Sequence, residues 1–249
     1  MTAEGVYVYA IVRAEKALPA HATGVGSPAA PVRSMRQGRV AAVVSEAPPT
    51  LRARRRDLLA HQELLLRLSE RGPVLPMRFG MVVTDEKAVR TQLAAHEAVH
   101  VAALEHLSGG VEVNVKALPA QDALVSLVAE DGNIRRLRDA VRRRPGYEAS
   151  IRLGEAVAAA LESRAVEAGQ RILRELAPRA RAVARGPEVQ GCVLNTSFLV
   201  SRDDSDAFRA AAERLARANR DRVELRLAGP LPCYSFVSAD GTPPRTAGV

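Results

Sequence analysis

The sequence predicts an α+β protein of two domains, the second a ferredoxin-like βαββαβ sandwich with a helical insertion. Three observations lead to this fold class. Short apolar runs rich in β-branched residues alternate with longer stretches of helical periodicity. The pair Gly109-Gly110 separates an N-terminal group of elements from a C-terminal group. From Val111 onward the expected order is strand, helices, two strands, helix and strand, which is the order of that sandwich.

This division sets the expected domain boundaries. Residues 1–109 are predicted to form an N-terminal α+β domain, and residues 110–238 the ferredoxin-like domain. The helical insertion is expected at about 119–185. Residues 239–249 are predicted to form a flexible polar tail.

The first domain is expected to begin with a buried strand at Val6–Val12 (VYVYAIV), followed by a second strand at Val40–Val44. A helix is predicted over Leu51–Arg71, and Gly72-Pro73 ends it. Its residues at three- and four-residue spacing should share one inward face. These residues are Leu51, Leu58, His61, Leu65 and Leu68.

Two further elements complete this domain. Val74–Val83 (VLPMRFGMVV) is predicted to be extended, with interruptions at a proline and a glycine. One continuous helix is predicted over Asp85–Leu107, with Thr84 or Asp85 as its N-cap.

The second domain should start with the alternating strand Val111–Val115. Helical sequence follows over Gln121–Arg144, with a break at Asp131-Gly132. The next helical stretch, Glu148–Arg185, contains Pro178 and should kink or break there.

The end of the second domain is predicted from the remaining patterns. Glu188–Ser201 is expected to form two strands that fold back near Leu194-Asn195. Asp203–Asn219 has the spacing of an amphipathic helix, and Val223–Leu227 that of a last strand. The proline-containing segment Gly229–Val237 (GPLPCYSFV) should be extended.

Composition excludes several classes of protein. The two cysteines form neither a disulfide framework nor a metal-binding pair, which favours a reducing cytoplasm. No signal peptide or membrane-spanning run is recognisable. The net charge of +8 is the difference between 36 basic residues, of which 33 are arginines and 3 are lysines, and 28 acidic residues. Abundant arginine and alanine is typical of GC-rich coding, and an acidic partner is the alternative explanation.

The stretch His96–His106 (HEAVHVAALEH) matches the H-E-x-x-H pattern of zinc peptidases. Metzincins have a glycine where this chain has Ala103, so the helix should continue and turn His106 away from His96 and His100. No later glutamate is marked as a third ligand. We therefore interpret the two histidines as packing residues and expect no metal, no cofactor and no catalytic residue, with a peptidase centred on His96, Glu97 and His100 as the alternative.

A nucleic-acid-binding module is the second alternative, because basic runs occur at Arg52–Arg56 and Ile134–Arg144. Ferredoxin-like sheets that bind RNA stack bases on aromatic residues of the central strands. The expected central strands contain only Phe198. We therefore expect solvated helix faces and no nucleic-acid partner.

Six segments, in order, resemble the gas vesicle protein F/L family over roughly residues 5–118 and 150–238. The segments are VYVYAIV, VLPMRFGMVV with Arg78-Phe79-Gly80, VEVNVKAL, IRLGEAVAAAL, LNTSFLV and GPLPCYSFV. In the last segment, Leu231 stands where the family has tryptophan, and Cys233 where it has proline.

The resemblance implies a non-enzymatic accessory or minor structural protein of gas vesicles, located in the cytoplasm at the vesicle. Its expected partners are the hydrophobic gas vesicle shell protein and other gas vesicle accessory proteins, with no lipid membrane involved. A soluble binder of such a subunit needs an apolar surface or an open sheet edge. The two extended segments could form this surface or pack in the core. The candidate partner-binding residues are Arg78, Phe79, Gly80, Pro230, Tyr234 and Phe236.

Overall fold

The computed structural model describes residues 5–237, which fall into two compact units. The described part of the first unit is 5–112 with 229–237, and the second unit is 113–228. The predicted boundary instead placed 229–238 in the second domain. The difference arises because Tyr234 and Ser235 hydrogen-bond to His61 and Glu112 of the first unit. The predicted tail, 239–249, lies outside the described residues.

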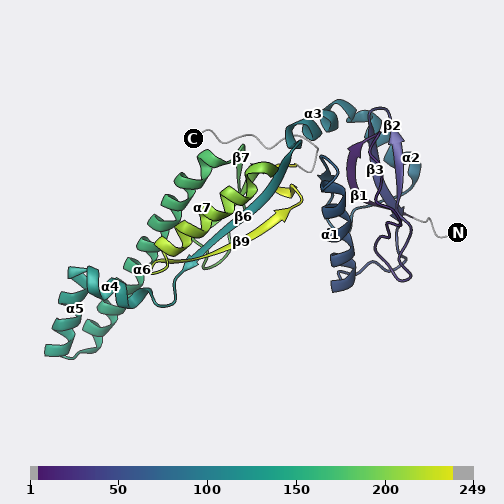
Figure 1. Cartoon of the computed structure of the whole chain (residues 1–249). Coiled ribbons are helices and arrows are strands. Elements are labelled where there is room, and N and C mark those ends of the chain that lie inside the picture. The colour runs from purple at the N-terminus through teal and green to yellow at the C-terminus, as the bar shows by residue number, and fades with distance from the viewer. Residues whose placement is uncertain (1–4, 238–249) are drawn as a thin grey trace. The chain divides into compact units, whose positions relative to one another are not determined.

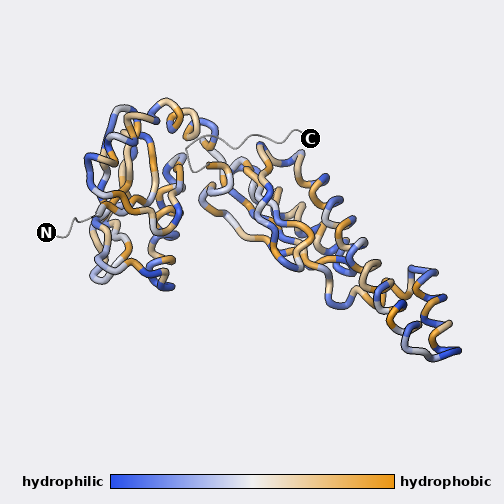
Figure 2. Tube along the Cα trace, turned by 180° about the vertical axis from the view of Figure 1, so that it is seen from behind, coloured by the Kyte–Doolittle hydropathy of each residue, from blue (hydrophilic) through white to orange (hydrophobic). Residues whose placement is uncertain are grey.

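The first unit is built on an antiparallel sheet whose central strand is β1 (Val6–Arg13). The strand order is β2-β3-β1-β4, and β5 also pairs with β1. β1 is apolar along nearly its whole length because helices cover both faces of the sheet (Figure 1). Figure 2 shows the resulting concentration of hydrophobic residues in this sheet. The other strands are β2 (Arg33–Gln37), β3 (Val40–Glu46), β4 (Leu75–Pro76) and β5 (Val82–Val83).

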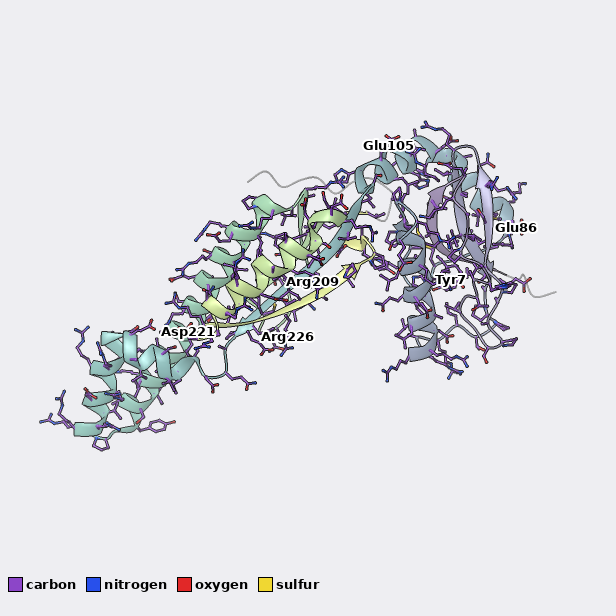
Figure 3. The ribbon with its side chains drawn as sticks, in the orientation of Figure 1. Tyr7, Glu86, Glu105, Arg209, Asp221 and Arg226 are labelled. Atoms are coloured by element: carbon purple, nitrogen blue, oxygen red, sulfur yellow. The ribbon has the colours of Figure 1, made fainter. Side chains whose placement is uncertain are left out.

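Strand β2 was not predicted from the sequence. Its residues RSMRQ are mostly polar because it forms one edge of the sheet, where Met35 is buried and its neighbours are not. Arg33 of this strand forms an ion pair of 2.6 Å with Glu86, which is labelled in Figure 3.

Three helices pack on this sheet: α1 (Arg55–Ser69), α2 (Glu86–Ala95) and α3 (Glu97–Leu107). The predicted cap is confirmed, since the Asp85 carboxylate accepts from the Ala88 amide at 2.7 Å. Two predictions are wrong. Leu58 is 42% exposed rather than inward-facing. The helix predicted over Asp85–Leu107 divides at His96, whose backbone (φ −117°, ψ 16°) is not helical.

The second unit contains an antiparallel sheet of order β7-β8-β6-β9, as the ferredoxin-like prediction requires. Helices α6 (Tyr147–Leu176) and α7 (Ser205–Ala218) accompany it, and Phe208 of α7 packs against Phe198 of β8 with ring centroids 5.2 Å apart. The strands are β6 (Gly110–Pro119), β7 (Ala182–Arg185), β8 (Leu194–Ser201) and β9 (Val223–Leu231).

The position of the hairpin in this sheet corrects the prediction. Helix α6 ends at Leu176, and Pro178 lies in a short 3₁₀ turn, so the chain becomes extended well before Arg185. β7 then pairs antiparallel with β8, from Ala182 opposite Leu199 to Arg185 opposite Thr196. Leu194-Asn195 therefore begins a strand and does not form the turn that was predicted there.

The range predicted for the helical insertion, 119–185, also includes the second half of α6 and β7, which belong to the sheet and its covering helices. The inserted helices are α4 (Ala123–Glu130), α5 (Gly132–Arg143) and the first half of α6. These helices pack on one another and extend beyond the sheet of the second unit (Figure 1), and we call residues 121–164 the helical arm. The predicted break at Asp131-Gly132 is confirmed. The Asp131 carboxylate accepts from the amides of Asn133 (2.8 Å) and Ile134 (3.1 Å), capping α5.

Arg164 forms ionic contacts at the base of the helical arm. It pairs with Glu130 at 2.7 Å and lies 3.8 Å from Asp221, which is labelled in Figure 3. Within residues 5–237, no helix combines the length and the hydropathy needed to cross a bilayer.

Candidate interaction site

The site that unites the two extended segments is centred on His61 of α1, which is only 3% exposed. Its Nδ1 lies 2.9 Å from the hydroxyl of Tyr7, which is labelled on β1 in Figure 3. Its Nε2 lies 3.1 Å from the carbonyl oxygen of Met77 and 3.3 Å from the hydroxyl of Tyr234. One imidazole thus connects the helix, the central strand and both extended segments.

These contacts determine the protonation of the ring. The Met77 carbonyl can only accept, so Nε2 carries the hydrogen and Nδ1 accepts from the Tyr7 hydroxyl. Burial lowers the pKa of His61 below its usual 6.5, which favours this neutral form. Burial also raises the pKa of Tyr7, so its hydroxyl keeps the proton that it donates.

The loop between β4 and β5 is fixed against β1 by backbone and side-chain hydrogen bonds. The Met77 amide donates to the Tyr9 carbonyl (2.8 Å), and the Val8 amide donates to the Met81 carbonyl (2.9 Å). The Gly80 amide donates to the Tyr7 hydroxyl at 3.1 Å. Gly80 has φ +89°, a conformation that favours glycine. The segment Arg78-Phe79-Gly80 is therefore held in one shape at the sheet edge.

The structure brings two of the six predicted residues together at His61. The Phe79 ring lies 5.7 Å from the imidazole, and the Tyr234 hydroxyl contacts it. Tyr234 is 37% exposed, and burial raises its pKa to about 12. Arg78 and Gly80 are exposed beside them. We call these residues the His61 surface: His61, Arg78, Phe79, Gly80, Met81 and Tyr234.

The other two predicted residues differ in exposure. Phe236 is only 2% exposed and belongs to the core, whereas Pro230 is exposed at the end of β9. Gly229–Val237 was predicted to be extended, but Tyr234–Phe236 forms a short 3₁₀ turn. This turn is anchored through Ser235. Its amide and hydroxyl donate to the two carboxylate oxygens of Glu112, at 2.9 and 2.7 Å.

The sequence did not predict the exposed apolar residues within and next to the His61 surface. Met81 and Val82 are each 43% exposed, although their setting in VLPMRFGMVV is typical of a core strand. Leu58, one turn before His61 on α1, is also exposed. The sequence pattern places Leu58 on the inward face of α1. Only the packing of α1 on the sheet shows that this side chain is exposed.

The H-E-x-x-H stretch has a structural role in the folded chain. The Glu97 carboxylate accepts from the Arg39 amide at 3.0 Å and so holds the turn between β2 and β3. His100 is buried, His96 is exposed, and their ring centroids are 6.0 Å apart. Across residues 5–237, no cluster of three or more His, Cys, Asp or Glu side chains could hold a metal. The glutamate that a peptidase would use on water is thus bound to backbone.

Comparison with known proteins identifies the family of this chain. The sequence profile of the gas vesicle synthesis protein GvpL/GvpF family matches residues 5–238. The chain belongs to this family.

Relatives in the GvpL/GvpF family cover nearly the whole chain. A gas vesicle protein F of Streptomyces sp. (strain CB03234) is 43% identical over 93% of this chain and 98% of its own length. A gas vesicle protein L of the same strain is 32% identical over 92% and 91%. The crystal structure of GvpF from Anabaena sp. PCC7120 superimposes with a TM-score of 0.76 at 26% identity, covering 94% of this chain and 98% of that one. The two-sheet α+β fold is therefore that of GvpF.

The fold of this GvpL/GvpF member also bears on the nucleic-acid alternative. Phe198, the one aromatic residue on the expected central strands, is fully buried against Phe208. It cannot stack on a base, so the sheet lacks the aromatic platform that RNA-binding ferredoxin-like domains use.

Proposed function

We propose that this chain supports gas vesicle assembly by binding the hydrophobic gas vesicle shell protein at the His61 surface and the adjoining sheet edge. The proposal gives it the role of an accessory or minor structural protein that works in the cytoplasm at the vesicle. It acts by binding, with no catalytic centre or cofactor. Other gas vesicle accessory proteins are further partners in this proposal.

The observation that carries the proposal is an interrupted edge strand with exposed apolar side chains. Val82 of β5 pairs with Tyr7, and Pro76 of β4 pairs with Ala10 on the same side of β1. β4 and β5 thus form the outer edge of the described sheet opposite β2. Exposed sheet edges are templates for an added strand, and the exposed Met81 and Val82 offer apolar contacts beside that edge.

The surroundings of this edge suit a partner that must remain soluble until it is assembled. A shell subunit with an apolar face aggregates unless that face is covered. Arg78 is exposed and, within residues 5–237, takes part in no ion pair, so it keeps its hydration beside the apolar contacts. Charge at an edge also discourages one copy of the chain from pairing with another.

The rigid support under the surface favours tight binding. The Tyr7 and His61 contacts fix the loop before the partner arrives, so less conformational entropy is lost on binding. Met81 and Val82 can then contribute through the apolar area that they bury, about 1 kcal/mol each, because only the 43% of each residue that is exposed remains to be covered.

The test is co-expression with the shell protein, followed by measurement of the shell protein that stays soluble and co-elutes. Val82→Asp places a charge in the proposed contact and should reduce co-elution about tenfold or more. Val189→Asp is the matched control, because Val189 is also a 43% exposed valine but lies in the second unit. Equal co-elution of the two variants would contradict the proposed site.

A further inference from the structure

Positive charge is concentrated at the tip of the helical arm, although the arm as a whole is nearly balanced, with eight arginines and seven carboxylates over residues 121–164. Residues 132–147 contain six arginines and one carboxylate, Asp139. Asp139 pairs with Arg138 at 2.9 Å. Over residues 5–237, no ion pair involves the other five arginines. These are Arg135, Arg136, Arg142, Arg143 and Arg144.

The five arginines that form no ion pair within residues 5–237 are exposed, whereas Arg138, about 40° from Ile134 around the helix, is half-buried on the packed side. Ile134 is buried, and Leu137 and Val141 on the same side are half-buried. At about 100° per residue, Arg136 and Arg143 lie on the opposite side of the helix. Both are exposed. This charge therefore faces solvent or a partner and takes no part in the folding of the arm.

Exposed apolar side chains follow the arginines directly. Tyr147 is 84% exposed and Ile151 is 43% exposed, and they lie one turn apart on the same side of α6. Tyrosine and arginine are enriched among the residues that dominate binding energy at protein interfaces. We call Arg142, Arg143, Arg144, Tyr147 and Ile151 the tip surface.

We propose that the tip surface binds an acidic amphipathic helix of another protein. The spacing of Tyr147 and Ile151 fits the apolar stripe of such a helix, and the three arginines fit acidic residues beside that stripe. A second copy of this chain is a poor occupant, because two chains of net charge +8 repel each other. A single exposed aromatic is also a poor stacking platform for a nucleic acid. This inference concerns the second unit and does not depend on the shell-binding site.

The experiment uses the full chain and a synthetic, fluorescently labelled amphipathic helical peptide with leucines on one side and glutamates on the other. Fluorescence anisotropy gives the dissociation constant. Replacing Arg142, Arg143 and Arg144 together with glutamine should weaken binding about tenfold. The matched control replaces the exposed Arg52, Arg54 and Arg55 with glutamine, which removes the same charge from the first unit and should change binding less than about twofold.

Two further measurements separate charge from apolar contact. Tyr147→Ala should also weaken binding about tenfold, and this loss should persist at about 0.5 M salt, where charges are screened. A peptide with glutamine in place of every glutamate should bind about tenfold more weakly. Equal binding of the tip and control variants, or of the two peptides, would overturn the inference. Tighter binding of a poly-dT oligonucleotide through the same arginines would overturn it in favour of a nucleic-acid surface.

Discussion

Substitution of Tyr7 by phenylalanine is the most informative perturbation of the His61 surface. It removes one oxygen atom, which donates to His61 Nδ1 at 2.9 Å and accepts from the Gly80 amide at 3.1 Å. The ring itself stays, so its packing against Tyr9, His61 and Phe79 is retained. The change therefore isolates the hydrogen bonds.

The expected loss follows from the burial of the groups left behind. An unsatisfied buried polar group costs about 1–3 kcal/mol, and the 3% exposed His61 leaves no route for water to its Nδ1. Gly80 is exposed, so its amide can donate to water instead, and the loss of its hydrogen bond to Tyr7 lowers the stability less. We expect Tyr7→Phe to lower the free energy of unfolding of the first unit by about 2–3 kcal/mol.

Amide hydrogen exchange is the suitable assay, because one denaturation curve for two units does not define a single free energy. Amides of β1 should exchange about 30- to 140-fold faster in the variant. Tyr147→Phe is the control. Because Tyr147 is 84% exposed, removing its hydroxyl should lower the free energy of unfolding by less than about 0.5 kcal/mol. A change in β1 of less than about twofold for Tyr7→Phe would refute the role assigned to its hydroxyl.

Three further predictions concern stability. Gly38→Ala should destabilise the chain by about 1–3 kcal/mol, since Gly38 has φ +57° and an added Cβ would collide with the Glu97 carboxylate. Gly154→Ala, in open space on α6, should instead stabilise by up to about 1 kcal/mol, and thermal unfolding distinguishes the two. Asp131→Ala should cost about 1 kcal/mol and speed amide exchange in α5, whereas unchanged exchange there would contradict its capping role. The pKa of His61 is lowered in the folded chain, so the unfolded chain binds more protons below about pH 6.5 and stability should fall as pH drops from there. His61→Gln should make this dependence weaker when the free energy of unfolding is measured as a function of pH. An unchanged slope would contradict the role of His61 in the pH dependence. Burial also lowers the pKa of His100, so this residue contributes to the pH dependence in the same direction.

Strong local signals in the sequence account for the elements that were predicted. VYVYAIV is apolar and rich in β-branched and aromatic residues, which is typical of a strand buried on both faces, and β1 is such a strand. The break at Asp131-Gly132 was visible because an aspartate before a helix start caps it. The order β7-β8-β6-β9 followed from counting strands and helices, even though the hairpin was placed too late in the chain.

The missed elements depend on contacts that are distant in sequence. β2 is a strand because it pairs with β3, and its polar residues carry little strand preference of their own. β7 follows Pro178 in a stretch that continues the helical pattern, and its pairing with β8 decides its conformation. His61 was expected only to face inward on its helix. Its partners Tyr7 and Tyr234 lie 54 and 173 positions away, so no local pattern could indicate the site.

Co-elution with the gas vesicle shell protein in about 0.5 M salt tests the central proposal most directly, because charge-based association is screened over a few Å there. The proposed shell-protein site predicts that the shell protein stays soluble with the unmodified chain and with Val189→Asp, and that it pellets with Val82→Asp. Shell protein that pellets in the presence of the unmodified chain, or that co-elutes equally with both variants, would contradict it.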